Sequence, residues 1–180
     1  MLERPTLPTE ETFLPLTILL EGYYPDWEGT KQLRGTAKRL SHMFQDFCWP
    51  EWKIEKALEE HTKLFEDGYE ELLTVEGIDI VTLCPHHLLP CRLKVAVSYA
   101  PRGKVLGLSK FARIAEILGK RPIMQETYTR ELAECLWTRT SPKMVEVRVK
   151  GVHGCITFRG AKQEHTEVET IVCLPRGGSK

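Results

Sequence analysis

Two short segments far apart in the chain carry residue types that bind transition metals. The first is Cys84-Pro85-His86-His87, where a cysteine and a histidine three residues apart can reach one ion as the chain turns after a strand. The second supplies His153 and Cys155, two residues apart on an expected strand and therefore on one face of it. Thiolate and imidazole are the ligands that zinc prefers. The two segments together predict a zinc site.

The number of donors leaves two kinds of zinc site open. Four protein ligands would close a tetrahedral ion that only braces the fold, whereas three would leave a position for a water whose pKa the metal lowers to about 7. The segments offer five donors, more than a closed site needs, and structural zinc usually takes two compact Cys-x-x-Cys knuckles. We therefore favour a catalytic site. The remaining alternative, a set of unconnected buried residues, is weakened by the doubled histidine beside a cysteine.

A third segment combines cations with the expected start of a helix. Ser109 opens the helix, Lys110 lies in its first turn and Arg113 lies one turn later. Backbone N–H groups and the helix dipole favour an anion there, and cations oppose the dipole, so a bound polyphosphate would account for them. The alternative is a Ser109 N-cap with both cations in solvent. Arg159, expected on the strand face that carries the second metal segment, adds another cation.

Gln125 and Glu126 open the next expected helix and offer an amide beside a carboxylate. Such a pair can read the edge of a guanine, since a carboxylate accepts hydrogen bonds from its ring and exocyclic N–H groups. Acidic residues also complement the dipole at a helix start, so the pair by itself is weak support for a nucleobase site.

Apolar periodicity assigns the elements that must position these side chains. It predicts helices over residues 10–21, 35–47, 51–66, 109–118 and 125–138. Alternation predicts strands over 73–83, as a strand pair or one bulged strand, and over 93–100, 145–159 and 166–174. Strands and helices come in blocks rather than in strict alternation, which indicates an α+β fold.

Composition limits the partners. The chain has 180 residues, with 25 Lys and Arg against 25 Asp and Glu, so no overall field attracts it to nucleic acid or to an anionic membrane. Its longest apolar stretch, residues 13–20, is too short to cross a bilayer and lacks the features of a signal peptide. Without a secretory signal, the six cysteines are expected as thiols, metal ligands and core residues. We expect a cytoplasmic protein.

The motifs, in their order and near spacing, resemble those of the GTP cyclohydrolase I family. The resemblance rests on residues 84–90, on Gly107 to Arg113, on Gln125-Glu126, and on His153-Gly154-Cys155 followed by Arg159-Gly160. It implies a T-fold, an antiparallel sheet with helices on one face, in residues 68–180, after an N-terminal helical segment in residues 1–67. It also implies a ring-shaped homo-oligomer, typically a decamer, with active sites between subunits.

The same resemblance assigns roles to the candidate residues. The family's zinc ligands fall on Cys84, His87 and Cys155, and its catalytic histidines fall on His86 and His153. Its guanine-recognition pair falls on Gln125 and Glu126. Its ribose and triphosphate contacts fall on Ser109, Lys110, Arg113, Arg159 and, from the N-terminal helices, Arg39. The sequence departs from the family at Pro85, where Glu is usual, and at His42, where Lys is common.

The implied reaction is a zinc-dependent hydrolysis of GTP. An activated water attacks C8 of the guanine, formate leaves, and ribose rearrangement with ring closure gives 7,8-dihydroneopterin triphosphate, a precursor of folate, other pterins or 7-deazapurines. His153 is the expected general acid and base, because an imidazole takes and gives a proton near neutral pH. Two alternatives stay open: a zinc-stabilised T-fold scaffold without the reaction, and a cyclohydrolase for another purine nucleotide. A zinc deaminase is disfavoured, since His-x-Glu with a downstream Pro-Cys-x-x-Cys does not occur.

Overall fold

Helices fill the first of the two units into which the chain divides, residues 1–50 and 51–180. The computed structural model describes residues 7–25 and 28–175. The first unit contains α1 (Glu10–Tyr23), the 3-10 helix η1 (Glu28–Leu33) and α2 (Thr36–Phe47), so the helices expected over 10–21 and 35–47 are confirmed. The helices α1 and α2 pack through Phe13 and Phe44, whose ring centroids lie 5.0 Å apart.

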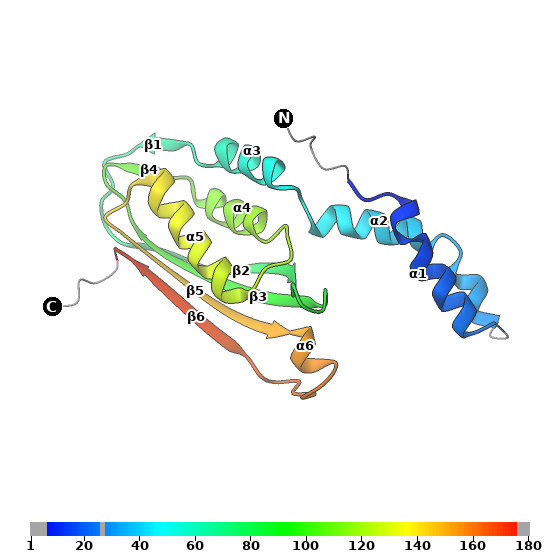
Figure 1. Cartoon of the computed structure of the whole chain (residues 1–180). Coiled ribbons are helices and arrows are strands. Elements are labelled where there is room, and N and C mark those ends of the chain that lie inside the picture. Colours follow the sequence, from blue (N-terminus) through cyan, green and yellow to red (C-terminus); the bar gives the residue numbers. More distant parts are fainter. Residues whose placement is uncertain (1–6, 26–27, 176–180) are drawn as a thin grey trace. The chain divides into compact units, whose positions relative to one another are not determined.

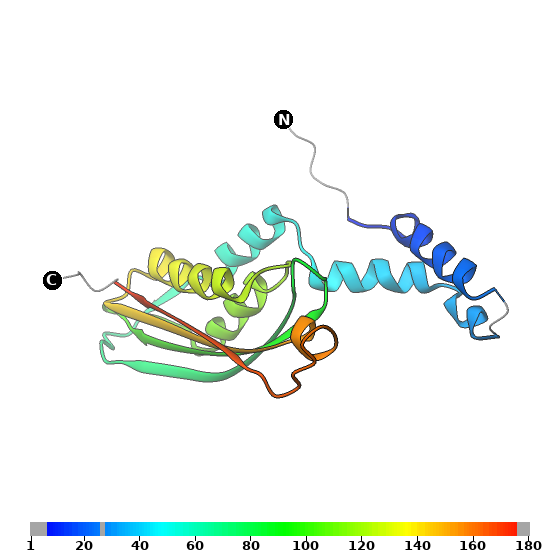
Figure 2. The ribbon, with the colours of Figure 1, turned by 60° about the horizontal axis from the view of Figure 1, so that its bottom comes forward.

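The second unit is built on a four-stranded antiparallel sheet with helices on one face (Figures 1 and 2). Its elements are α3 (Glu51–His61), β1 (Leu64–Glu66), β2 (Leu73–Leu83), β3 (Pro90–Ala100), β4 (Lys104–Leu106), α4 (Leu108–Leu118), α5 (Gln125–Thr140), β5 (Met144–His153), α6 (Gly154–Thr157) and β6 (Val168–Leu174). The strand order is β2-β3-β5-β6, and β1 and β4 form a separate two-stranded ribbon. This is the α+β arrangement that the T-fold resemblance implied.

Every second residue of the central strands faces the helices and is buried. On β3 and β5 these residues are mainly valine, leucine and tyrosine, and α4 and α5 cover them with Phe111, Ile114, Tyr128, Leu132 and Leu136. Figure 2 shows both helices lying over one face of the sheet. The strand β2 is a single bulged strand, whose register shifts between Val75 and Ile78, with Gly77 at φ 73°. The alternation in the sequence therefore identifies the face that is buried.

The strand expected over 145–159 is too long. It ends at His153, and Gly154–Thr157 forms the short helix α6. The neighbouring strands account for this end: β3 begins at Pro90, so Cys91 pairs with His153, and β6 pairs with β5 only as far as Gly151. Residues after His153 have no strand on either side to supply hydrogen bonds. The expectation that His153, Cys155 and Arg159 share a strand face is therefore wrong.

Two expected boundaries near helices also need correction. The helix expected over 51–66 ends at His61, because Leu64, Phe65 and Glu66 pair with β4 as strand β1. Their apolar spacing fits a helix equally well, and the pairing with a distant strand decides the outcome. The helix expected to begin at Ser109 begins at Leu108 with Gly107 as N-cap, so Ser109 lies inside the first turn and is not a cap.

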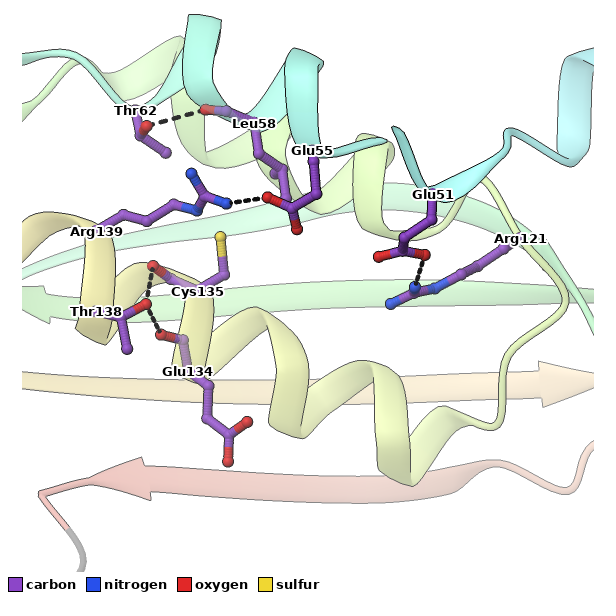
Figure 3. Close-up of polar contacts among 9 residues, drawn as sticks. All are labelled: Glu51, Glu55, Leu58, Thr62, Arg121, Glu134, Cys135, Thr138 and Arg139. Carbon is purple, nitrogen blue, oxygen red and sulfur yellow. Dashed lines mark hydrogen bonds and ion pairs between the residues drawn. The ribbon is translucent and has the colours of Figure 1, made fainter. Parts of the chain in front are cut away.

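Ion pairs fix α3 to the sheet unit (Figure 3). Arg139 on α5 donates to Glu55 at 2.5 Å, and Arg121, in the loop before α5, donates to Glu51 at 2.8 Å and pairs with Glu131. The arginine side chains are about a quarter exposed, 26% and 23%, whereas their glutamate partners are more than half exposed, so water still screens these pairs. The compact units accordingly divide after Pro50. The assignment of residues 1–67 and 68–180 as domains stays a prediction.

None of the helices in the described ranges combines the length and apolarity that a bilayer crossing requires.

Candidate active site

The loop after β2 closes on itself and brings Cys84 and His87 together. The backbone N–H of Cys84 donates to Leu89 O at 2.9 Å, and that of Leu88 donates to Cys84 O at 2.8 Å. Leu88 adopts a φ of 53°, the left-handed conformation that tightens this turn. As a result, Cys84 Sγ lies 3.7 Å from His87 Nδ1.

Cys155 completes a group of three donors, although α6 rather than a strand presents it. The ligand atoms of Cys84, His87 and Cys155 all lie within 4.8 Å of one another. A tetrahedral zinc with ordinary bond lengths separates a sulfur and a nitrogen ligand by roughly 3.6 Å, close to the 3.7 Å between Cys84 and His87. Two thiols and one imidazole are also the donor types that zinc prefers. These residues fit a zinc ion.

The surroundings of Cys155 oppose its ionisation. The pKa of Cys155 is raised, first by its burial and then by the neighbouring Cys84. A divalent cation reverses this effect, because it compensates both thiolates at once. The pair therefore suits a bound metal better than two free thiols.

A pocket of about 200 Å³ opens beside this group. Its walls include Cys84, Cys155 and four further predicted site residues: His86, Gln125, Glu126 and His153. Much of the remaining lining is apolar, from Ile123, Met124, Ile156 and Val168. His86 Nδ1 lies 4.0 Å from Cys84 Sγ, at the limit of a sulfur contact. The pocket therefore offers thiol, imidazole and carboxylate groups within an otherwise apolar wall, as ligand sites usually do.

The imidazole of His153 lies between two side chains. Its Nε2 is 2.7 Å from Gln125 Oε1, and its Nδ1 is 3.2 Å from Cys91 Sγ. Burial lowers the pKa of His153, and the carboxylate of Glu126 partly opposes this shift. The ring is therefore neutral near pH 7, in the form that accepts a proton.

The Gln125 side chain is almost completely buried, with 2% exposed. Its Nε2 donates to Val149 O at 3.0 Å, to Val168 O at 2.9 Å and to Thr170 Oγ1 at 3.1 Å. Two of these partners are carbonyl oxygens, which only accept, so the amide nitrogen must face them and Oε1 must face His153. The amide that the sequence suggested for guanine is thus bound within the protein.

Gly151 leaves the room that Gln125 needs. A Cβ at this position would lie 2.1 Å from Gln125 Oε1 and 2.7 Å from Leu93 Cδ2. Only glycine therefore permits the amide oxygen to lie where it meets His153.

Sequence reasoning did not single out Cys91, Gly151 or Thr170 as site residues. The signal for Cys91 was its position in the strand after the Cys84 loop, but its contact depends on the pairing of Cys91 with His153 across β3 and β5. That register is set by the whole sheet and is not visible in a local motif.

The expected anion-binding residues of α4 do not line this pocket. Ser109 and Lys110 lie in the first turn of α4, which follows β4 at the end of the sheet that carries Ala100. The connection between α4 and α5 lies at the opposite end, against the end of β2, where Ile123 N donates to Leu83 O at 3.0 Å. Eleven helical residues span about 16 Å, which separates the start of α4 from the pocket. Among the described residues, none from α4 lines the pocket.

The cations of α4 gather around His61. Lys110 Nζ donates to His61 Nδ1 at 3.2 Å. The pKa of His61 is lowered by partial burial first and then by the charges of Lys110 and Arg113. His61, at the end of α3, is therefore neutral and accepts from Lys110. It does not compensate the positive charge of Lys110 or that of Arg113.

Arg159 and Arg39 have separate surroundings. Arg159 is exposed after α6 and is close enough to Cys155 for its charge to lower the pKa of that thiol slightly. Arg39 lies on α2 in the first unit, where its guanidinium donates to Thr36 Oγ1 at 2.8 Å and to Gln32 O at 3.2 Å.

Comparison with known proteins gives one consistent family. The family described as GTP cyclohydrolase I matches residues 20–176. A protein named GTP cyclohydrolase 1 from Pelotomaculum thermopropionicum is 38% identical over 158 residues, which cover 87% of this chain and 80% of that protein. Proteins with the same name from Streptococcus gordonii (39% over 164 residues; 91% and 84% covered) and Carboxydothermus hydrogenoformans (36% over 172 residues; 93% and 85%) are similar to it as well.

Proposed function

The chain belongs to the GTP cyclohydrolase I family, and from this premise we propose that it converts GTP to 7,8-dihydroneopterin triphosphate with release of formate, with the help of a zinc ion. Cyclohydrolase activity on GTP follows from a family match that covers most of the chain and from relatives 36–39% identical. The observation that carries the finer proposal is the convergence of Cys84, His87 and Cys155, since Cys84 and Cys155 line one pocket together with His153.

Cys84, His87 and Cys155 would hold the metal, and their donor types and spacing support this assignment. Zinc bound by three protein ligands supplies Lewis acidity, which makes water nucleophilic near neutral pH. The remaining tasks fall to other side chains. They must move protons, hold the base and hold the phosphates.

His153 is proposed to move the protons. Because Nε2 donates to Gln125 Oε1, the nitrogen left to take a proton is Nδ1, and the attacking water must displace the contact of Nδ1 with Cys91 Sγ at 3.2 Å to deliver it. Gln125 then holds the ring in place and stabilises its charged form through the same amide oxygen. The proton returns to the departing nitrogen of the guanine ring as the C8–N bond breaks. His86, at the pocket wall, assists this transfer or holds the water or the ribose.

We assign the recognition of guanine to the carboxylate of Glu126, which is exposed at the pocket wall and accepts from ring and exocyclic N–H groups. Gln125, the other member of the expected pair, has its amide nitrogen bound within the protein, so we assign to it the orientation of His153. Two carbonyls and a hydroxyl that accept from this nitrogen support the assignment.

The ribose and triphosphate contacts remain assigned to Ser109, Lys110, Arg113, Arg159 and Arg39. Since the start of α4 lies away from the pocket of its own chain, we propose that Lys110 and Arg113 serve the pocket of a neighbouring copy in a homo-oligomer. Binding the triphosphate there supplies remote binding energy that positions the guanine at the metal. Every described cysteine is a free thiol, which suits the reducing cytoplasm to which we assign the reaction.

Incubation of the purified protein with GTP, with and without added zinc, tests this proposal. Mass spectrometry should find formate and 7,8-dihydroneopterin triphosphate, and chelation of the metal should stop their formation. Unchanged GTP with a full complement of zinc would instead identify a scaffold protein. Turnover of another purine triphosphate in preference to GTP would identify a cyclohydrolase of different specificity.

A further inference from the structure

Cys91 has no part in the metal site or the proposed reaction, yet it is buried against the ring of His153. The residue is 2% exposed, and its Sγ lies 3.2 Å from His153 Nδ1. We propose that Cys91 is a positioning residue, whose thiol donates to Nδ1 of His153 and, together with Gln125 on the other side, holds the imidazole in the tautomer with its proton on Nε2. The proposal rests on the proposed role of His153 in proton transfer.

The orientation of the Gln125 amide determines which nitrogen of His153 carries the proton. Its nitrogen is fixed by Val149 O and Val168 O, so its oxygen faces Nε2 of His153 at 2.7 Å. An amide oxygen only accepts, and the imidazole nitrogen opposite must therefore carry the proton. In a neutral ring this leaves Nδ1 as an acceptor, which needs a donor when it is buried.

Cys91 is the donor within reach among the described residues. Another acceptor near Sγ, Leu89 O, is 3.9 Å away, compared with 3.2 Å for Nδ1. The side chain of Cys91 is 2% exposed, and burial favours the neutral thiol, which can donate, over the charged thiolate. An S–H group is a weak donor, so it can orient the ring and still be displaced by a water or substrate proton.

The buried network continues behind Gln125 and makes its orientation rigid. Thr170 Oγ1 accepts from Gln125 Nε2 and lies 2.6 Å from Thr129 Oγ1, which itself donates to Gln125 O at 2.8 Å. The hydroxyl of Thr170 therefore donates to that of Thr129. Side chains from β6, α5, β5 and β3 thus form one chain of hydrogen bonds that ends at Cys91.

Two spectroscopic measurements on the zinc-loaded protein test the contact without reference to activity. Protein labelled with ¹⁵N-histidine should show His153, assigned by comparison with His153→Gln, with a protonated Nε2 and a hydrogen-bonded, unprotonated Nδ1. The infrared S–H stretch of Cys91 should lie at lower wavenumber than that of Cys135 and should rise in His153→Phe. A proton on Nδ1, or an S–H band that does not respond to His153→Phe, would overturn the proposal.

Kinetics test whether the contact positions the ring. In Cys91→Val, kcat should fall about fivefold, equivalent to the roughly 1 kcal/mol of a neutral hydrogen bond, while KM for GTP changes little. Cys91→Ser keeps a donor and should restore most of kcat. Cys135→Ala, a second buried cysteine that lies outside the pocket lining, controls for a loss of packing and should keep wild-type kcat.

The outcomes separate the two proposals. If the wild-type protein turns over GTP and Cys91→Val keeps both its kcat and its histidine spectrum, the positioning role is wrong and the proposed function stands. If the wild-type protein does not turn over GTP, the proposed function is wrong, and the spectra alone support or overturn the contact between Cys91 and His153.

Discussion

Gly151 and Gln125 face each other so closely that a methyl group on the glycine would lie 2.1 Å from the amide oxygen that meets His153. Gly151→Ala must therefore displace that oxygen or the strand. We expect a destabilisation of about 1–3 kcal/mol, typical of overpacking, together with a loss of kcat. Urea unfolding and steady-state kinetics measure the two effects.

Gly119→Ala is the matched control for this prediction. A Cβ there would lie 2.9 Å from Ile80 Cγ2, but Gly119 ends α4 outside the pocket lining. It should lose stability and keep its kcat once folded. If both variants lose kcat alike, the space at Gly151 has no particular importance for the site.

His153→Ala should separate chemistry from metal binding. We expect turnover to be abolished, while zinc content and GTP binding remain near those of the wild type, because His153 holds neither the ion nor the phosphates in our assignment. Cys155→Ala should instead lose zinc, since it removes one of three donors. Elemental analysis and GTP binding measure this contrast, and loss of zinc in His153→Ala would reverse the assigned roles.

Glu126→Gln should impair the choice of base more than the fold. The carboxylate is exposed, so stability should change by less than about 0.5 kcal/mol. An amide no longer accepts from two guanine N–H groups, and kcat/KM for GTP should fall toward that for inosine triphosphate, which lacks the exocyclic amine. An unchanged ratio of the two kcat/KM values would show that Glu126 does not read the base.

Stability should decline at alkaline pH in part through Cys135. Burial raises the pKa of this thiol from 9.0 to about 11. The unfolded chain then releases the proton before the folded protein does, so the stabilisation is complete below pH 9 and is lost as pH rises through 11. This amounts to roughly 3 kcal/mol. Urea unfolding of Cys135→Ala should show a shallower decline over that interval, and an equal slope would contradict this explanation.

The metal site shows which features a local sequence pattern can predict and which it cannot. The donor types and spacing in the two segments are enough to predict that they meet at a metal, and the resemblance to the family selects Cys84, His87 and Cys155 among the five donors. The expected geometry was nevertheless wrong, since Cys155 lies on α6 rather than on a strand. Where β5 ends depends on where its neighbours β3 and β6 begin, and a local pattern of alternation does not contain that information.

The same limit applies to β1 and to Cys91. Leu64 and Phe65 suit a helix or a strand by their spacing, and the distant residues of β4 decide between the two. The contact of Cys91 with His153 depends on one pairing among the residues of a long antiparallel register. The long amphipathic elements, by contrast, were predictable, because each buries a continuous face over three turns or more.

The distance between the start of α4 and the pocket of the same chain has a consequence for mixtures of defective chains. If each copy lends Lys110 and Arg113 to its neighbour, a chain without these cations and a chain without Cys155 are both inactive alone, yet they complement each other when assembled together. If equal amounts of the two chains assemble at random, about a quarter of the sites should be intact. Each intact site combines the metal ligands of a chain without the cations with the cations of a neighbouring chain without Cys155.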